Sequence, residues 1–263
     1  GRYFQDIFSF REFLPGLAFK AEEGQNVGFS TVIGNNTGFI FYFKNEGDTV
    51  SRAYPIATGI NFNLARHFSQ VINDPTGTPI EVVTEPTTSY DLGQYAGGKS
   101  TFGMYVKLDM SPLDEFLDTL ENANFNQVTL EMGPVVNFSA DRLPPQFHIM
   151  FFTNETNEVL FRTDGLPMAV QPEGRVQVDP VTSEPIYSDQ PALLAFNNSE
   201  KFYRQFITSH VNALYRKKMP RRDFLLYPAV STQDRNFIQS LKDYVIDQNT
   251  IKMKIFYSRS RSL

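Results

Sequence analysis

The sequence contains no cysteine and no tryptophan, and it has only three histidines among 263 residues. The lack of cysteine excludes disulfides, thiolate metal sites, Fe–S clusters and a cysteine nucleophile. It does not fix the compartment, because such a chain suits an oxidising or a reducing environment. Apolar runs are short: GFIFYF at 38–43 falls far below the ~20 residues that a membrane-spanning helix needs. The sequence therefore predicts no transmembrane helix.

Charge of one sign is also scarce, since the formal net charge is only -5. A chain without a global basic field is not expected to bind nucleic acid or an anionic membrane surface. Any basic binding site must therefore be local.

Aromatic residues are abundant, with 25 Phe and 12 Tyr, and Gly and Pro are scattered between them. Aromatic side chains fit a pleated, half-buried surface, so this composition predicts a β-dominated fold with many turns. The turn GNNTG at 34–38 is expected to join two strands as a hairpin. The expected strands are 17–22, 27–33, 39–44, 56–62, 103–107, 126–132, 146–153, 159–163, 174–179, 223–230 and 250–257.

One long helix is expected at about 199–217. Between Phe202 and Tyr215 the apolar residues recur at three- and four-residue spacing, which predicts one apolar stripe packed on a core. Ser199 is a suitable N-cap, and cations follow the stripe, where they complement the helix dipole. Shorter helices are expected at 6–14, 64–72, 112–120 and 232–244.

A loop-like stretch at 72–95, rich in Pro, Thr and Gly, marks the expected domain boundary. We therefore predict an N-terminal β-rich segment at 1–86 and a second domain at 87–263. A further loop with three prolines is expected at 179–191.

Six segments carry a resemblance to a known family: SFREFLPGLAFKAE (9–22), GFIFYFK (38–44), INFNLARHFSQVINDPTG (60–77), AGGKSTFGMYVKL (96–108), NQVTLEM (126–132) and NTIKMKIFYS (249–258). Their order resembles the Bacteroidetes lipoproteins grouped as domain of unknown function 4270. The resemblance covers residues 9 to 258 and the later part of a typical member, which is longer at its N-terminus and begins with a lipobox cysteine.

The resemblance implies an exported cell-envelope lipoprotein, anchored in the outer membrane by an upstream lipid-modified cysteine that this sequence does not contain, and periplasmic or on the cell surface. The later half of the family looks similar to jelly-roll modules that accompany polysaccharide-active proteins. The implied fold is mainly β, a jelly-roll-like β-sandwich with one long amphipathic helix and a few short helices. A fold does not carry a function, so the site must be argued separately.

The histidines do not form a recognisable catalytic or metal motif. His67 matches the "FN…H" position of the family and is a candidate ligand-binding residue, or else a structural hydrogen-bonding group. His148 alternates inside QFHIMFF and is expected in a sheet, and His210 is expected as a satisfied core histidine. There is no HExxH and no pair of histidines at helical spacing, so no metal site is predicted.

Carboxylates suitable for glycoside hydrolysis exist at Asp114, Glu115 and Asp118, but DEFLD is typical of a solvated helix face. No G-x-S-x-G nucleophile motif occurs. GQYAGGKS at 93–100 matches the phosphate-loop pattern literally, yet a strand-like segment follows it rather than a helix. The family resemblance described above implies a turn role for its glycines, before a strand. We predict no catalytic residue and no cofactor.

Two kinds of surface residue are candidates for binding. Exposed aromatic side chains in loops suit a sugar ligand; these candidates are Tyr90, Tyr95 and Tyr187, together with His67, although the tyrosines also suit a cap on the sandwich. A basic patch is expected from the two cationic segments: Arg216, Lys217, Lys218, Arg221, Arg222, Arg259 and Arg261. Cations between a helix and a strand are usually a solvated turn. The segments are expected to converge if the strand ending near 258 lies beside the one starting at 223.

Taken together, these features favour a non-catalytic envelope lipoprotein that binds a glycan or another envelope protein. A glycan-processing enzyme is the alternative, and it requires carboxylates that converge in a cleft. A structural assembly subunit is the second alternative, and it requires an exposed apolar patch or an open sheet edge.

Overall fold

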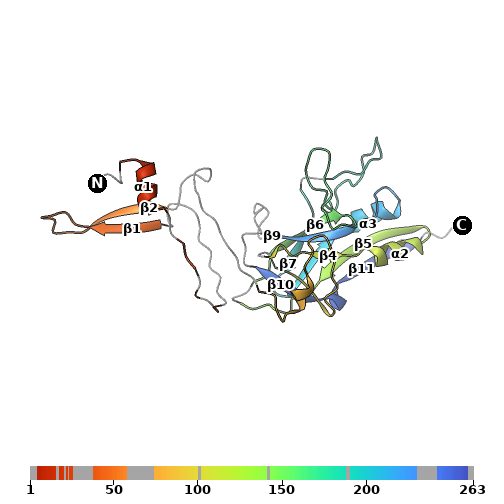
Figure 1. The fold of residues 1–263 in the computed structure, drawn as a ribbon. Coiled ribbons are helices and arrows are strands. Elements are labelled where there is room, and N and C mark those ends of the chain that lie inside the picture. Colours follow the sequence, from red (N-terminus) through yellow and green to blue (C-terminus); the bar gives the residue numbers. More distant parts are fainter. Residues whose placement is uncertain are drawn as a thin grey trace. The chain divides into compact units, whose positions relative to one another are not determined.

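The fold was analysed in a computed structural model, which describes residues 5–15, 18–20, 22, 24–25, 38–57, 74–99, 102–140, 143–187, 190–229 and 242–259. The chain divides into two compact units, Gly1–Gln70 and Val71–Leu263 (Figure 1). The architecture is mainly β, which confirms the predicted fold class at that level. None of the helices in these residues is long and apolar enough to cross a membrane.

The first unit consists of a short helix and a β-hairpin. Helix α1 (Ile7–Phe13) begins after Asp6, whose carboxylate accepts hydrogen bonds from the backbone N–H groups of Phe8 and Ser9 at 2.8 and 2.9 Å. The hairpin pairs β1 (Gly38–Phe43) with β2 (Arg52–Ala57) in antiparallel register, so that Phe41 lies opposite Tyr54. Such a cap and turn order the backbone without burying a core.

The prediction for β1 is confirmed, but its described partner differs from the one expected. The strand pairs with the segment that follows it, because NEGD at 45–48 forms the turn, with Gly47 at φ +88°. Residues 18–20 and 22 form no strand although 17–22 was predicted to be one. The expected strand at 27–33, the GNNTG turn at 34–37 and the helix at 64–72 lie outside the described residues.

The second unit is built on a seven-stranded antiparallel sheet in the order β11-β5-β8-β7-β6-β9-β4 (Figure 1). Its strands are β4 (Val106–Leu108), β5 (Ala123–Met132), β6 (Phe147–Thr153), β7 (Leu193–Asn197), β8 (Phe202–Phe206), β9 (Asp223–Ala229) and β11 (Lys252–Arg259). A separate ribbon pairs β3 (Tyr95–Lys99) with β10 (Asp243–Asp247). The remaining elements are α2 (Ser111–Asp118), α3 (Thr208–Tyr215) and the short 3₁₀ helices η2 (Pro79–Val82) and η5 (Gln248–Thr250).

The core of this unit lies on one face of the large sheet. Alternate side chains of the long strands point into it, as the two-residue period of a strand requires. The helices and the ribbon contribute buried side chains to the same cluster. Its most deeply buried members include Leu130, Met132, Met150, Leu194, Tyr203, Val211, Leu214, Phe224, Leu226, Tyr244 and Ile246.

The predicted long helix is wrong in its first half. Residues 202–206 form β8, between β5 and β7, and the helix begins only at Thr208. The reason is that β8 has hydrogen-bonding strands on both sides, while the Asn197 side chain accepts from the N–H groups of Ser199 and Glu200 and closes the preceding turn. Two paired edges outweigh an apolar spacing that fits a helix.

Other expected elements survive in part. The predictions at 126–132, 146–153, 223–230 and 250–257 are confirmed as β5, β6, β9 and β11, and the helices at 6–14 and 112–120 as α1 and α2. Segments 159–163 and 174–179 form only isolated bridges, and the strand expected at 103–107 is shorter and begins at Val106. The expected helix at 232–244 lies largely outside the described residues, and its last two residues belong to β10.

The expected boundary near residue 86 and the division into compact units do not fall at the same place. The contacts divide the chain after Gln70. The loop at 74–94 that precedes β3 therefore belongs to the second unit, which it joins through the hydrogen bond from the Ser89 hydroxyl to the Asn157 side chain at 3.1 Å.

Candidate ligand-binding site

The end of helix α3 holds two lysines in fixed positions. The N–H of Lys217 donates to the Leu214 carbonyl and that of Lys218 to the Ala213 carbonyl, both at 2.9 Å. This pair of bonds is the Schellman arrangement, which requires a left-handed residue at the first position past the helix. That residue is Lys217, with φ +55°, where glycine is the residue that fits without a steric penalty.

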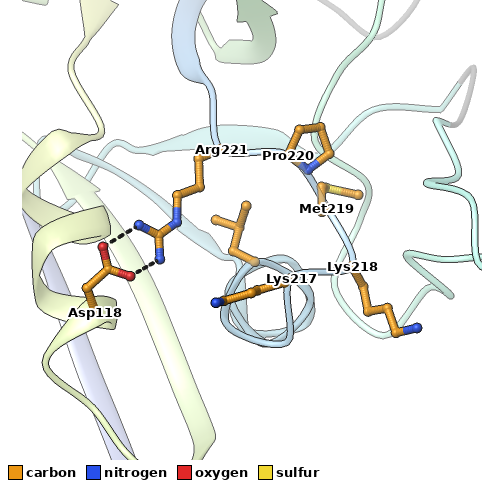
Figure 2. A pocket seen from close by; sticks show the side chains of 7 residues that line it. Asp118, Lys217, Lys218, Met219, Pro220 and Arg221 are labelled. Carbon is orange, nitrogen blue, oxygen red and sulfur yellow. Dashed lines mark hydrogen bonds and ion pairs between the residues drawn. The ribbon is translucent and has the colours of Figure 1, made fainter.

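The turn forms one side of an open surface pocket of about 520 Å³ (Figure 2). Its lining residues are Asp118, Leu214, Lys217, Lys218, Met219, Pro220 and Arg221. Leu214 and Met219 are buried and give the pocket an apolar floor. The pocket therefore combines an apolar base with a charged rim.

Arg221 is paired with two carboxylates of helix α2. Its two terminal guanidinium nitrogens donate to the Asp118 carboxylate at 2.8 and 2.6 Å (Figure 2). Its Nε lies 3.4 Å from Asp114 Oδ1. The hydrogen bond from Arg221 lowers the pKa of Asp118. Burial raises the pKa of Asp114, although Arg221 opposes that shift. The expected solvated face at 114–118 is therefore tied to an arginine.

The two lysines supply the charge that remains on the rim. Figure 2 shows the Lys217 and Lys218 side chains leaving the turn in different directions. Within the described part of the chain, neither forms an ion pair, whereas Arg221 binds two carboxylates. Because Asp118 is compensated by Arg221, the pocket presents a net positive rim.

Further cations of the expected basic patch lie at the neighbouring end of the sheet. The Arg216 guanidinium donates to Asn124 Oδ1 at 3.4 Å, and Asn124 lies opposite Ser258 in the β5–β11 ladder. Next along β11, the Arg259 guanidinium lies 5.6 Å from the centre of the Tyr257 ring. Arg222 is exposed. Arg261 lies outside the described residues.

Arg216 is therefore linked to the end of β11 through Asn124 of β5, which is not the expected route. Strand β11 does not lie beside β9, because β5, β8, β7 and β6 separate them in the sheet. The contact runs instead from the end of α3 to β5 and across the ladder to β11. The sequence does not reveal this route because it follows from strand order, which local patterns do not encode.

The predicted sugar-binding side chains are dispersed. Tyr95 opens β3 and is 46% exposed. The Tyr90 hydroxyl accepts from the Glu85 N–H at 3.0 Å within its own loop, and Tyr187 packs edge-on against Phe152 at 5.7 Å between ring centres. None of these three lines the pocket. His67 lies outside the described residues.

Two histidines are core residues rather than ligands. His148 lies between the rings of Tyr203 and Tyr244, with ring centres 4.4 and 4.5 Å away, and burial lowers its pKa to about 3. Burial lowers the pKa of His210 to about 4. Both histidines lie where they were predicted, but the expectation that His210 is fully hydrogen-bonded is wrong. Among the residues described, neither nitrogen of His148, nor Nδ1 of His210, has a hydrogen-bond partner.

Residues Tyr95–Lys99 of GQYAGGKS form strand β3 and not a phosphate loop. Only Gly93 lies in a turn, with φ +81°, so the turn role expected for its other glycines is wrong. Gly97 and Gly98 lie in β3, where a Cβ on Gly97 would overlap the Tyr244 carbonyl oxygen and one on Gly98 would come within 2.8 Å of the Tyr244 ring. The glycines are needed for the close approach of β10.

Among the residues that the structure describes, no group of three or more His, Asp or Glu side chains is placed to hold a metal ion. Comparisons of the chain with protein-family models, with curated proteins and with solved structures give no match. The function must therefore be argued from the pocket itself. Sequence reasoning selected its lysines as part of a charge run; a cation at the position of a helix-terminating glycine is the signal that singles out Lys217.

Proposed function

We propose that this protein is a non-catalytic binding module that holds an anionic polymer, an acidic glycan, in the pocket at the end of α3. Lys217 and Lys218, which are exposed on the rim, bind the carboxylate or sulfate groups. Arg216, Arg222 and Arg259 extend the cationic surface for further repeat units.

The observation that carries the proposal is the backbone of Lys217. A lysine at φ +55° carries a steric penalty that glycine avoids, of roughly 1 kcal/mol. Backbone strain at a residue on the rim of a pocket points to a role for its side chain. The ordinary alternative, that the lysines only complement the helix dipole, does not require a lysine at the left-handed position.

We also propose the setting that the family resemblance implies, an exported lipoprotein of a Bacteroidetes cell envelope held at the outer membrane. It rests on the sequence segments alone. The jelly-roll-type sandwich remains part of the same proposal. It is supported by the way the β3–β10 ribbon packs Tyr244 against His148 and Tyr203 of the large sheet, as a second layer does.

Binding to polygalacturonate, with neutral dextran as the comparison, tests the proposal. The double variant Lys217→Ala/Lys218→Ala is expected to weaken binding about tenfold or more, and added salt is expected to weaken binding by the unmodified chain. Lys252→Ala is the matched control, because it removes an exposed cation at the far end of β11. Equal loss in the control, or equal binding to dextran, would contradict a site at the turn.

The rival function, a glycan-processing enzyme, assigns different residues. Asp114 and Asp118 have pKa values shifted in opposite directions, which is the pattern of an acid and a base pair. Both carboxylates, however, face Arg221, which donates two hydrogen bonds to Asp118. Hydrolysis of an acidic polysaccharide that disappears in Asp114→Asn would favour the enzyme. Binding without cleavage favours the module.

A further inference from the structure

A second surface, far from the pocket in sequence, lies on the hairpin of the first unit. The strand β1 reads GFIFYF and contains no charge, and all six of its residues are exposed. Alternate residues of a strand share a face, and directly opposite residues do too. One face therefore carries Phe39, Phe41 and Phe43 together with Tyr54 and Arg52, which lie opposite Phe41 and Phe43.

Phe19 extends this face, because its ring is stacked on Phe39 with centres 6.4 Å apart and planes within 6°. We call these five side chains the aromatic face: Phe19, Phe39, Phe41, Phe43 and Tyr54. Their exposed fractions run from 36% to 67%. A contiguous aromatic surface of this kind marks an interaction site in a soluble protein.

The first unit has no core of its own in the residues described. Every buried residue of the described chain belongs to the second unit, the first of them being Gly98. An isolated two-stranded hairpin is at best marginally stable in water, so covering the aromatic face would stabilise the hairpin.

We propose that the aromatic face is a self-association surface, covered by the same face of a second copy of this chain. Two-fold pairing places a surface against itself, so the surface must be self-complementary. Arg52, which lies opposite Phe43 on this side of the hairpin, is paired with Asp48 at 3.0 Å, so this cation is not set unpaired against its own copy. Offset or edge-to-face ring pairs form as readily between identical faces as between different ones.

The area available also fits a dimer. Five partly exposed aromatic side chains present on the order of 500 Å² per copy, so a pair of faces buries about 1,000 Å². This reaches the lower bound for a specific protein interface, which begins near that value. The dimer is therefore expected to be specific but weak, and its population is expected to depend on protein concentration.

The opposite face of the hairpin provides the matched control. Tyr42 lies next to Phe41 on the same strand, is 71% exposed and points to the other side. Sedimentation equilibrium of the full chain, at roughly 10 to 500 µM for a weak interface, measures the dimer constant for the unmodified chain, Phe41→Lys and Tyr42→Lys. We expect Phe41→Lys to raise the dimer Kd by about tenfold or more, and Tyr42→Lys to leave it within about twofold.

A second variant, Tyr54→Lys, places the same charge on the aromatic face from β2, so a loss of the dimer does not depend on whether Phe41→Lys disturbs the folding of β1. It is expected to weaken the dimer as Phe41→Lys does. A chain that remains monomeric throughout the range overturns the proposal. So does a dimer that persists in both aromatic-face variants, or one that Tyr42→Lys disrupts equally. Growth into larger oligomers contradicts a closed pair of faces.

Discussion

Strands β1 and β11 are both rich in exposed apolar side chains, but they differ in how apolar and charged side chains are divided between their two faces. In β11, Met253 and Ile255 pack against the core, while Lys254 reaches Glu131 on the other face at 2.8 Å. A bulge interrupts its pairing with β5 between Phe256 and Tyr257. In β1, large apolar side chains occupy both faces, and both are exposed.

The difference shows how an edge strand is protected and what the lack of protection means. Charges and bulges are the devices by which sheet edges avoid joining another chain, and β11 has both. Strand β1 has no charge within its bounds. Its apolar surface is therefore better explained as a binding surface than as a tolerated exposure, whereas β11 closes the fold of its own unit.

Lowering the pH is expected to give the largest effect that distinguishes the second unit from the hairpin, a loss of stability in the second unit alone. The second unit buries His148 and His210 with pKa values of about 3 and about 4, against an ordinary value of 6.5. Both pKa values are lower in the folded protein than in the unfolded chain, so the two histidines contribute fully to stability above pH 6.5. This contribution is lost as the pH falls toward the folded-state pKa values. From pH 7 to pH 5 the unfolding free energy should fall by about 4 kcal/mol, since each histidine loses about 1.4 kcal/mol per pH unit below 6.5.

Urea unfolding at the two pH values measures this loss. The hairpin residues 38–57 contain no histidine, so the dimer constant is expected to change little while the second unit remains folded. A free energy of unfolding that stays flat from pH 7 to pH 5 would refute the neutral buried state of the two histidines.

A charge placed on each strand gives the next largest difference. Ile255→Lys puts an ammonium among the core neighbours of β11 and should lower the unfolding free energy of the second unit by about 3 kcal/mol. Phe41→Lys should change the same quantity by less than about 0.5 kcal/mol, because that side chain is exposed. Equal effects in urea titrations would show that the two strands do not differ as described.

The smallest expected effect concerns His148 alone. His148 lies between two tyrosine rings, and its two nitrogens have no hydrogen-bond partner in the described part of the chain, so His148→Phe keeps an aromatic ring and removes buried polar atoms. We expect stability at pH 7 to stay level or rise by about 1 kcal/mol. The pH dependence between 7 and 5 should drop to about half, with His210 carrying the remainder. An unchanged slope in the variant would assign the proton uptake to other groups.

Sequence patterns predicted the long strands well, because their alternation reflects one buried and one exposed face. This holds for β11, predicted at 250–257, where the half-buried Ile255 follows the exposed Lys254. The pattern failed at residues 202–206, whose apolar spacing fits a helix until the flanking strands are known. It also missed β3, where two adjacent glycines weaken a strand signal but allow β10 to approach closely.

The candidate site was predictable in composition and not in geometry. The cationic run at 215–222 was evident, but its division into an arginine bound by α2 and two lysines on the rim depends on Asp114 and Asp118 from a distant segment. The left-handed conformation of Lys217 follows from the way α3 ends. No local pattern predicts which residue of such a run will occupy that position.

Replacement of Lys217 by glycine tests the central claim most directly, because stability and binding are expected to move in opposite directions. Glycine fits φ +55° without strain, so Lys217→Gly should leave the melting temperature level or raise it by a few degrees. Its affinity for polygalacturonate should fall about fivefold or more through loss of one cation. A variant that is less stable, or one that binds as tightly as the unmodified chain, would contradict the assignment of this lysine to ligand binding.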